Sequence, residues 1–268
     1  TLISKETWKN DKLLRITIGI DTTAVNLIKK LGLNAILFEE CCEIIWGIKP
    51  YQIGHGYPKQ TKEMIQQRIY HSDTQIDKSW KPLLVGSNIN RYSINIKSLK
   101  YIKYGKNLMY ASSQIKMENP KILIRQTSDR IRGSYDEDNF YCQNSIFIIT
   151  SQSVNLKYLL AILNSKLMNF YYMTKNPQEG KVFAEIKPSV IKSIPIKDAD
   201  EKEQLKTKLL VDKILTAKKA DPNADTSQLE TAIDHLVYKL YDLTYEEIKI
   251  IDPDFALTPE EYANLAIN

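Results

Sequence analysis

Apolar residues recur at intervals of three and four positions in the second half of the chain. The first series consists of Leu156, Leu159, Leu160, Leu163, Leu167 and Phe170. This spacing places the series on one face of a helix, so it predicts an amphipathic helix over residues 155–172. A similar pattern predicts a helix over 201–219 and a second one carrying Leu229 to Tyr241. Thr244 and Glu247 have the spacing of a capping box, which predicts a third, short helix.

Short β-prone segments occupy the middle of the chain. Residues 145–150 (SIFIIT) give the clearest strand, and residues 121–125 (KILIR), which follow a proline, give another. Further strands are predicted within residues 36–48 and 94–104, where apolar and aromatic side chains are separated by polar ones. Because these segments are short and separated by turn residues, they predict a curved sheet whose strands are mostly antiparallel.

The order of these segments predicts an α+β fold: a twisted, mostly antiparallel sheet domain with packed helices, followed by a C-terminal helical hairpin. Near the N-terminus, Asp21 can cap a helix that Gly32 ends. We therefore expect three parts, namely an N-terminal segment with a helix at 1–35, a sheet domain at 36–197 and an acidic helical tail at 198–268.

Charge is distributed unevenly along the 268 residues, although the net charge is only +5. Residues 81–133 contain eleven Lys or Arg against two Asp or Glu, whereas residues 198–268 contain eight Lys against sixteen Asp or Glu. The basic middle is also rich in Tyr, Asn, Gln and Ser. Such a mixture suits a polyanion that is recognised by hydrogen bonding as well as by charge. A basic run is equally typical of a solvated surface, and lysines in strands discourage edge pairing.

Three segments combine cations with amide side chains, at residues 81–92, 125–132 and 175–187. Cations there would neutralise phosphates, and amides would read base edges in the major groove. The candidate DNA-binding residues are Lys81, Asn88, Asn90, Arg91, Lys106, Lys121, Arg125, Gln126, Arg130, Arg132, Asn144, Lys175, Gln178 and Lys181. Among them, Arg125, Arg130, Arg132, Lys81 and Arg91 are the first candidates for phosphate contact, and Asn88, Asn90, Gln126, Asn144 and Gln178 for base contact.

The sequence contains no apolar run long enough to span a membrane and no secretory signal pattern. Its three cysteines match neither a disulfide framework nor the spacing of a zinc site, which favours reduced thiols in a cytoplasmic protein. We predict no catalytic, cofactor-binding or metal-ligating residue. Two alternatives stay open: a stand-alone metal-dependent nuclease, for which Glu185-Ile186-Lys187 supplies half a motif, and a protein–protein scaffold whose acidic helices bind a basic partner.

Five segments occur in an informative order. They are residues 81–92 (KPLLVGSNINRY), 120–126 (PKILIRQ), 136–145, 156–172 with LNSKL and FYY, and 191–195, and the tail adds 233–244 (IDHLVYKLYDLT). Together they resemble the TaqI-like C-terminal specificity domain of adenine-specific DNA methyltransferases and of fused type IIG restriction–modification enzymes. The resemblance covers roughly residues 40 to 252, and none of its motifs is catalytic.

This resemblance implies that residues 36–197 are a DNA target recognition domain of a bacterial restriction–modification enzyme. The implied partners are double-stranded DNA and an upstream methyltransferase domain of the same polypeptide. That domain would bind S-adenosylmethionine and methylate adenine at N6, and whether the parent also uses Mg²⁺ to cleave DNA stays open. No cofactor is implied for this fragment, which begins at Thr1 and lacks both the glycine-rich cofactor loop and the Asn/Asp-Pro-Pro-aromatic catalytic loop.

Overall fold

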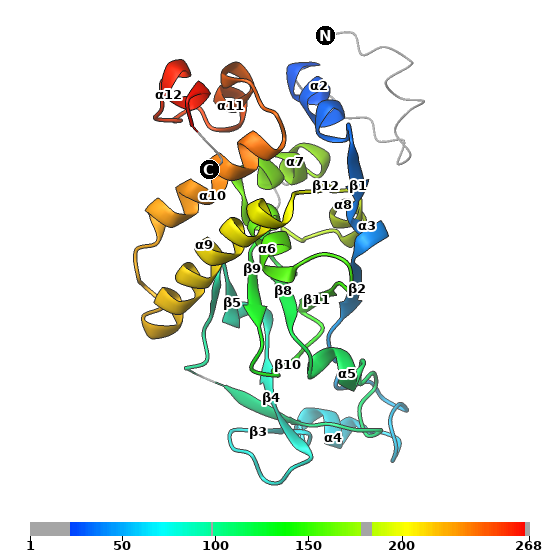
Figure 1. The fold of residues 1–268 in the computed structure, drawn as a ribbon. Helices are drawn as coiled ribbons and strands as arrows, with labels where there is room; N and C mark the ends of the chain where they lie inside the picture. The colour runs from blue at the N-terminus through cyan, green and yellow to red at the C-terminus, as the bar shows by residue number, and fades with distance from the viewer. Residues whose placement is uncertain (1–21, 98, 178–183, 266–268) are drawn as a thin grey trace, which may run out of the picture.

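The computed structural model describes residues 22–97, 99–177 and 184–265, and it shows a mixed α+β fold (Figure 1). The helices are α2 (Thr22–Leu31), α3 (Phe38–Cys41), α4 (Lys62–Gln66), α5 (Gln114–Met117), α6 (Leu156–Asn164), α7 (Lys166–Lys175), α8 (Pro188–Lys192), α9 (Glu201–Ala220), α10 (Ser227–Leu240), α11 (Tyr245–Ile251) and α12 (Pro259–Ala263), with a 3-10 turn η1 (Gly86–Asn88). The strands are β1 (Ala35–Leu37), β2 (Glu43–Trp46), β3 (His71–Ser72), β4 (Trp80–Leu84), β5 (Ile89–Asn90), β6 (Ser93–Ile94), β7 (Lys100–Lys103), β8 (Lys121–Arg125), β9 (Gly133–Asp136), β10 (Tyr141–Cys142), β11 (Ile146–Thr150) and β12 (Pro195–Lys197).

A central sheet of four strands, in the order β2-β11-β8-β9, is antiparallel throughout. The two inner strands, β8 and β11, are buried along most of their length, so their central residues are apolar instead of alternating with polar ones. The edge strands β2 and β9 carry polar residues, such as Glu43 and Ser134. Ile122 and Ile124 of β8 point to one face and join an upper core with α6, α7 and the tail helices. Leu123, between them, points to the other face and joins a lower core.

The lower core lies between the central sheet and a second sheet, in the order β10-β4-β7-β3. In this second sheet β10 pairs with β4 in parallel, while the other pairs are antiparallel. Two further antiparallel pairs complete the strands of the described residues, the hairpin β5–β6 and the pair β1–β12. The expected α+β fold with a mostly antiparallel sheet is therefore confirmed.

The helix predicted over residues 155–172 is in fact two helices, α6 and α7, which meet at Ser165. Ser165 has extended backbone angles (φ −62°, ψ 156°), and its hydroxyl accepts a hydrogen bond from the Met168 amide at 3.1 Å. The hydroxyl thus caps α7 in the way that serine caps helices in general. The apolar series continues through the break because Leu163 and Leu167 are both fully buried.

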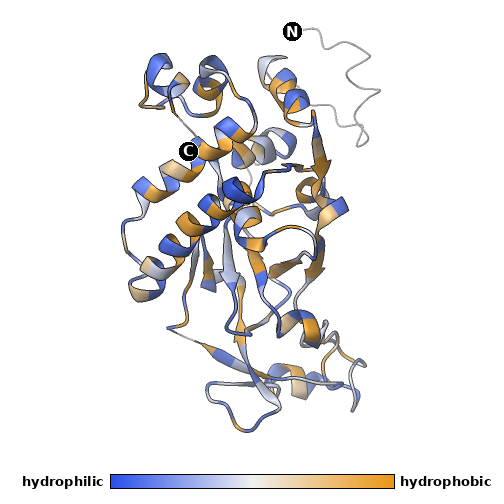
Figure 2. Ribbon diagram, in the orientation of Figure 1, coloured by the Kyte–Doolittle hydropathy of each residue, from blue (hydrophilic) through white to orange (hydrophobic). Residues whose placement is uncertain are grey.

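The acidic tail begins with the helical hairpin that the sequence predicts. Helices α9 and α10 form it, and Thr244 caps α11 with Glu247 in a capping box. The inner faces of the hairpin enter the upper core through residues such as Val211 and Ile233, both fully buried. Figure 2 shows apolar and polar positions alternating along α9 and α10, as expected for helices packed on one side. No helix within the described residues is long and apolar enough to span a membrane.

Ion pairs join the tail to the rest of the molecule with a consistent polarity. Five such pairs within the described residues place the cation before residue 198 and the carboxylate in the tail: Lys30–Glu247, Arg91–Glu230, Lys157–Asp212, Lys166–Asp252 and Lys197–Asp242. A sixth, Lys219–Asp138, has the opposite polarity. The uneven charge seen in the sequence is therefore partly used within the molecule, where the acidic tail neutralises cations that precede residue 198.

Candidate nucleic-acid interface

Three loops meet at one end of β8. The backbone amide of Gln126 donates to the Ser145 carbonyl at 2.9 Å, and the backbone amide of Gly86 donates to the Ser145 hydroxyl at 2.9 Å. The Tyr92 amide donates to the Gly133 carbonyl at 2.8 Å. We call residues 86–92, 125–132 and 143–145 the loop edge. It brings together eight of the predicted residues: Asn88, Asn90, Arg91, Arg125, Gln126, Arg130, Arg132 and Asn144.

Arg130 and Arg132 are the exposed cations of the loop edge, with 53% and 42% of their side chains accessible. Both pair with Asp129: Arg130 Nε lies 2.9 Å from one carboxylate oxygen and Arg132 Nη2 lies 3.3 Å from the other. Partial burial acts to raise the pKa of Asp129, but the hydrogen bond and charge of Arg130 outweigh it, so the pKa is lowered. The carboxylate therefore stays ionised and holds both guanidinium groups at the surface.

Two asparagines hold the 126–132 loop against the helices. Asn164, at the end of α6, is fully buried, and its amide group both accepts from the Gly133 amide at 2.9 Å and donates to the Gly133 carbonyl at 3.0 Å. Asn169 of α7 accepts from the Ile131 amide at 2.8 Å. Sequence reasoning missed both positioning residues. The available signal was a polar side chain on an apolar helix, because buried polar groups are almost always hydrogen-bonded.

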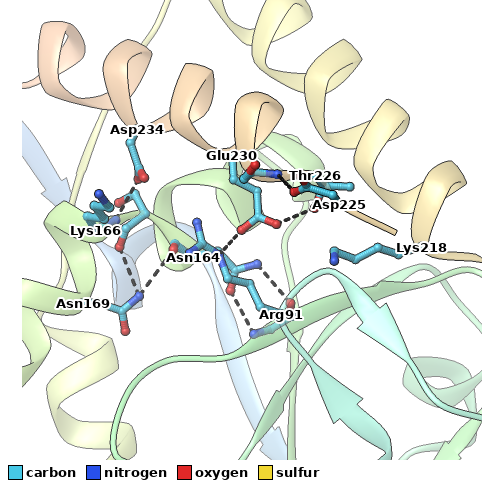
Figure 3. A network of polar contacts seen from close by, with 12 residues as sticks. Arg91, Asn164, Lys166, Asn169, Lys218, Asp225, Thr226, Glu230 and Asp234 are labelled. Carbon is cyan, nitrogen blue, oxygen red and sulfur yellow. Dashed lines mark hydrogen bonds and ion pairs between the residues drawn. The ribbon is translucent and has the colours of Figure 1, made fainter. Parts of the chain in front are cut away.

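Arg91 points to the tail, as Figure 3 shows. Its Nε lies 3.0 Å from Glu230 Oε2 on α10, and the guanidinium lies 5.6 Å from the centre of the Tyr92 ring. Glu230 is itself held by the Thr226 hydroxyl, which donates to it at 2.6 Å. Arg91 thus ties the β5–β6 hairpin to the tail, and a phosphate contact would require it to leave Glu230.

The amides of the loop edge differ in their availability. Asn88 is engaged locally, since its side-chain oxygen accepts from the Val85 amide at 2.7 Å and its nitrogen donates to the Asn95 carbonyl at 2.7 Å. It therefore shapes the hairpin. Asn90 is exposed at the end of that hairpin, and the side chains of Gln126 and Asn144 are partly exposed. These three remain the amides that can reach a ligand.

Lys121 requires a correction, because it is fully buried and cannot contact DNA in this structure. Its ammonium lies 2.5 Å from Asp136 Oδ2 and donates to the Met117 carbonyl at 2.5 Å. Burial raises the pKa of Asp136, although the charge of Lys121 opposes this. The pair joins β8 to β9, in which Lys121 and Asp136 are direct neighbours.

The other candidates lie away from the loop edge or outside the described residues. The Nζ atom of Lys81 lies 3.3 Å from Glu118 Oε1 and 5.6 Å from the centre of the Tyr141 ring. Lys106 is exposed on the side of the second sheet, and the ammonium of Lys175 lies 5.8 Å from the centre of the Tyr171 ring. Gln178 and Lys181 fall in a segment outside the described residues.

The nuclease half-motif is an exposed ion pair. Lys187 Nζ lies 3.1 Å from Glu185 Oε2, with nearly half of each side chain accessible. No group of three or more His, Cys, Asp or Glu in the described part of the chain could hold a metal ion. All three cysteines are free thiols, and Cys41 and Cys142 are buried.

Comparison with known proteins confirms the resemblance. Residues 81–196 match the family model of the TaqI-like C-terminal specificity domain. Over 192 residues the chain is 26% identical to a protein of Methanocaldococcus jannaschii named as a type II restriction enzyme and methyltransferase; the match covers 68% of this chain and 16% of that protein.

A solved structure with a TM-score above 0.5 shares the fold. The type IIL restriction-modification enzyme MmeI, solved in complex with DNA, superposes with a TM-score of 0.54 at 16% identity, covering 83% of this chain and 36% of MmeI. The type IIG restriction endonuclease BpuSI has a TM-score of 0.46 at 11% identity, with 83% of this chain and 34% of BpuSI covered. The chain thus spans about a third of these enzymes and about a sixth of the M. jannaschii protein.

Proposed function

From the TaqI-like C-terminal specificity domain that residues 81–196 carry, we propose that this chain is the DNA target recognition module of an adenine-specific DNA methyltransferase or of a fused type IIG restriction–modification enzyme. The family match is the observation that carries this proposal. The module holds a duplex and reads its sequence, while the chemistry takes place on another domain.

The loop edge is the surface that fits this function best. Arg130 and Arg132 neutralise phosphates, and in doing so they exchange the carboxylate of Asp129 for phosphate oxygens. Phosphate contacts set the position of the protein on the duplex without reading its sequence. Asn90, Gln126 and Asn144 then read base edges, since an amide side chain can form a bidentate pair with adenine in the major groove.

The parent protein supplies a catalytic domain upstream of this chain. That domain binds S-adenosylmethionine and acts on an adenine turned out of the duplex, because the amino group is inaccessible inside the base stack. The target recognition domain extends over residues 36–197. The pairing of β1 with β12 supports these limits, because it brings residues 35–37 beside residues 195–197. The protein works in the cytoplasm, where its duplex substrate is found.

Replacement of both exposed arginines tests the proposal. Arg130→Ala with Arg132→Ala removes two phosphate contacts, so the slope of log K against log salt concentration for a random-sequence duplex should flatten by about 1.8. Fluorescence anisotropy with a labelled duplex at several salt concentrations measures this slope. Lys202→Ala with Lys213→Ala removes the same charge from exposed positions of α9 and is the matched control. An unchanged slope in the arginine variant would show that the loop edge does not contact DNA.

A further inference from the structure

A second surface that no comparison assigns lies in the loop before α4. Residues 51–60, here called the Gln60 loop, hold two large apolar side chains in solvent: Ile53 is 64% exposed and Tyr57 is 81% exposed. In Figure 1, α4, which follows this loop, lies at the lower end of the molecule, opposite the tail helices α11 and α12. A single exposed apolar side chain needs no explanation. The unusual feature is that hydrogen bonds and close packing fix the backbone that carries Ile53 and Tyr57.

The rigidity comes from one buried side chain. Gln60 is only 2% exposed, and its amide nitrogen donates to the Pro50 carbonyl at 2.9 Å and to the Asn107 carbonyl at 2.7 Å. The side-chain oxygen of Gln60 accepts from the backbone amide of Gln52 at 2.9 Å, and the backbone carbonyl of Gln60 accepts from the backbone amide of Gly54 at 2.9 Å. The loop is therefore closed around a fully hydrogen-bonded amide.

Close packing fixes the part of the loop that carries Tyr57. Gly56 has φ +77°, and a Cβ at this position would lie 2.3 Å from the Asn107 carbonyl oxygen, so only glycine fits. The Tyr57 amide donates to the Lys106 carbonyl at 2.8 Å. The backbone of Tyr57 is thus anchored to the 105–108 turn while its ring extends into solvent.

The surroundings of the loop are positively charged. Residues 49–68 contain four cations and a single acidic residue, Glu63. The exposed cations around the loop, none of which forms an ion pair within the described residues, are Lys49, Lys59, Lys62, Arg68 and Lys106. The charge complements a polyanion, and the exposed aromatic ring complements a planar base.

The Gln60 loop also starts next to the loop edge. The backbone amide of Asn144 donates to the Ile48 carbonyl at 2.8 Å. Tyr51 is three residues further along the chain, so the loop begins within about 10 Å of that contact. The start of the Gln60 loop is therefore a neighbour of the loop edge.

We propose that the Gln60 loop is a second DNA-contacting element, in which Tyr57 inserts at a base step of the duplex and stacks on the base that it exposes, with Ile53 packed beside it, while the surrounding cations bind phosphates. The proposal rests on the proposed function and adds to it a contact that lies outside the matched segment 81–196. Side chains that insert at base steps of a duplex partly unstack them, and the bent duplex then contacts more of the protein surface. Since the loop is ordered before it meets DNA, little conformational freedom is lost on binding.

Substitution of Tyr57 in the 268-residue chain tests this contact with a labelled duplex of random sequence. Tyr57→Ala should weaken binding at least about fivefold because the inserted ring is lost, whereas Tyr57→Phe should bind like the wild type. Both variants should show the same salt dependence as the wild type, since neither changes a charge. Leu209→Ala removes an exposed apolar side chain from α9 and should have no effect.

The outcomes separate this inference from the function on which it rests. Binding by the wild type that Tyr57→Ala leaves unchanged would overturn the Tyr57 contact alone. Failure of the wild type to bind any duplex would overturn the proposed function, and the contact with it. A Tyr57→Ala variant that binds weakly with a flattened salt dependence would show that the residue acts through the neighbouring cations, which contradicts stacking. Equal thermal midpoints for all variants confirm that folding is unaffected.

Discussion

Asp129 controls how much positive charge the loop edge offers to a ligand. Its carboxylate pairs with both Arg130 and Arg132, so a phosphate must displace it. We expect Asp129→Asn to raise the affinity for duplex DNA by roughly 1.5- to 5-fold, because exposed ion pairs of this kind contribute about 0.2–1 kcal/mol. Anisotropy titration against a random duplex measures the change.

The control for this variant is Asp254→Asn, which removes one exposed carboxylate from the tail, remote in sequence from the loop edge. A loss of affinity in Asp129→Asn, with the control unchanged, would mean that Asp129 is needed to aim the arginines and that its loss costs more than the released charge gains.

Individual side chains show where sequence reasoning reaches its limit. Arg130 and Arg132 could be selected from charge alone and are indeed exposed. Lys121 could not be excluded in the same way, because its partner, Asp136, becomes its neighbour only through the register of β8 and β9. Arg91 likewise meets Glu230 from 139 positions away in the chain. A sequence gives the number of charges but not the direction in which each one points.

At the scale of the element, α6 and α7 act as the support for the 126–132 loop. Asn164 satisfies both backbone groups of Gly133 from a fully buried position. We expect Asn164→Ala to lower the free energy of unfolding by about 1–3 kcal/mol, because the buried Gly133 amide loses the Asn164 oxygen and the Gly133 carbonyl keeps only its bond from the Tyr92 backbone amide. Urea denaturation followed by circular dichroism measures this loss.

Asn169→Ala provides the comparison within the same support. Asn169 is only partly buried and accepts a single bond from the loop, from the Ile131 amide. Its removal should cost less than the removal of Asn164. The reverse order would show that the Gly133 bonds are not the principal attachment of the loop.

The elements themselves were largely predictable, and the exceptions have a physical cause. Periodicity predicted the tail hairpin and the strands at 121–125 and 145–150, since each has a strong apolar pattern. The break at Ser165 was missed because burial continues on both sides of it, so the apolar series carries no trace of the change in direction. The second sheet was only partly foreseen, since strands such as β3 and β10 have two residues each.

At the scale of the whole molecule, Asp234 makes the attachment of the tail sensitive to pH. This carboxyl is 3% exposed and accepts from the Lys166 amide at 2.8 Å. Burial is the main cause that raises its pKa from 3.8 to about 6. Between these values the folded protein binds more protons than the unfolded chain, so this group lowers stability as pH rises from about 4 to 6.

We expect Asp234→Asn to remove this penalty. The stability of the variant relative to the wild type should rise between pH 4 and pH 7 by roughly 1–3 kcal/mol. Urea denaturation of both proteins at several pH values measures the difference, and Asp254→Asn again serves as the exposed control. A difference that does not change with pH would show that Asp234 titrates normally in the folded protein.

The central sheet belongs to both cores at once, because Ile122 and Leu123, adjacent in β8, are fully buried in opposite ones. Because the central sheet lines both the upper and the lower core, unfolding of one core would expose the sheet residues of the other. We therefore expect the two cores to unfold together as a single thermodynamic unit. Free energy gained by a ligand on one half is therefore shared by the other through linkage. A ligand bound beside the lower core would therefore raise the free energy of unfolding of the upper core and its tail helices as well, although it contacts neither.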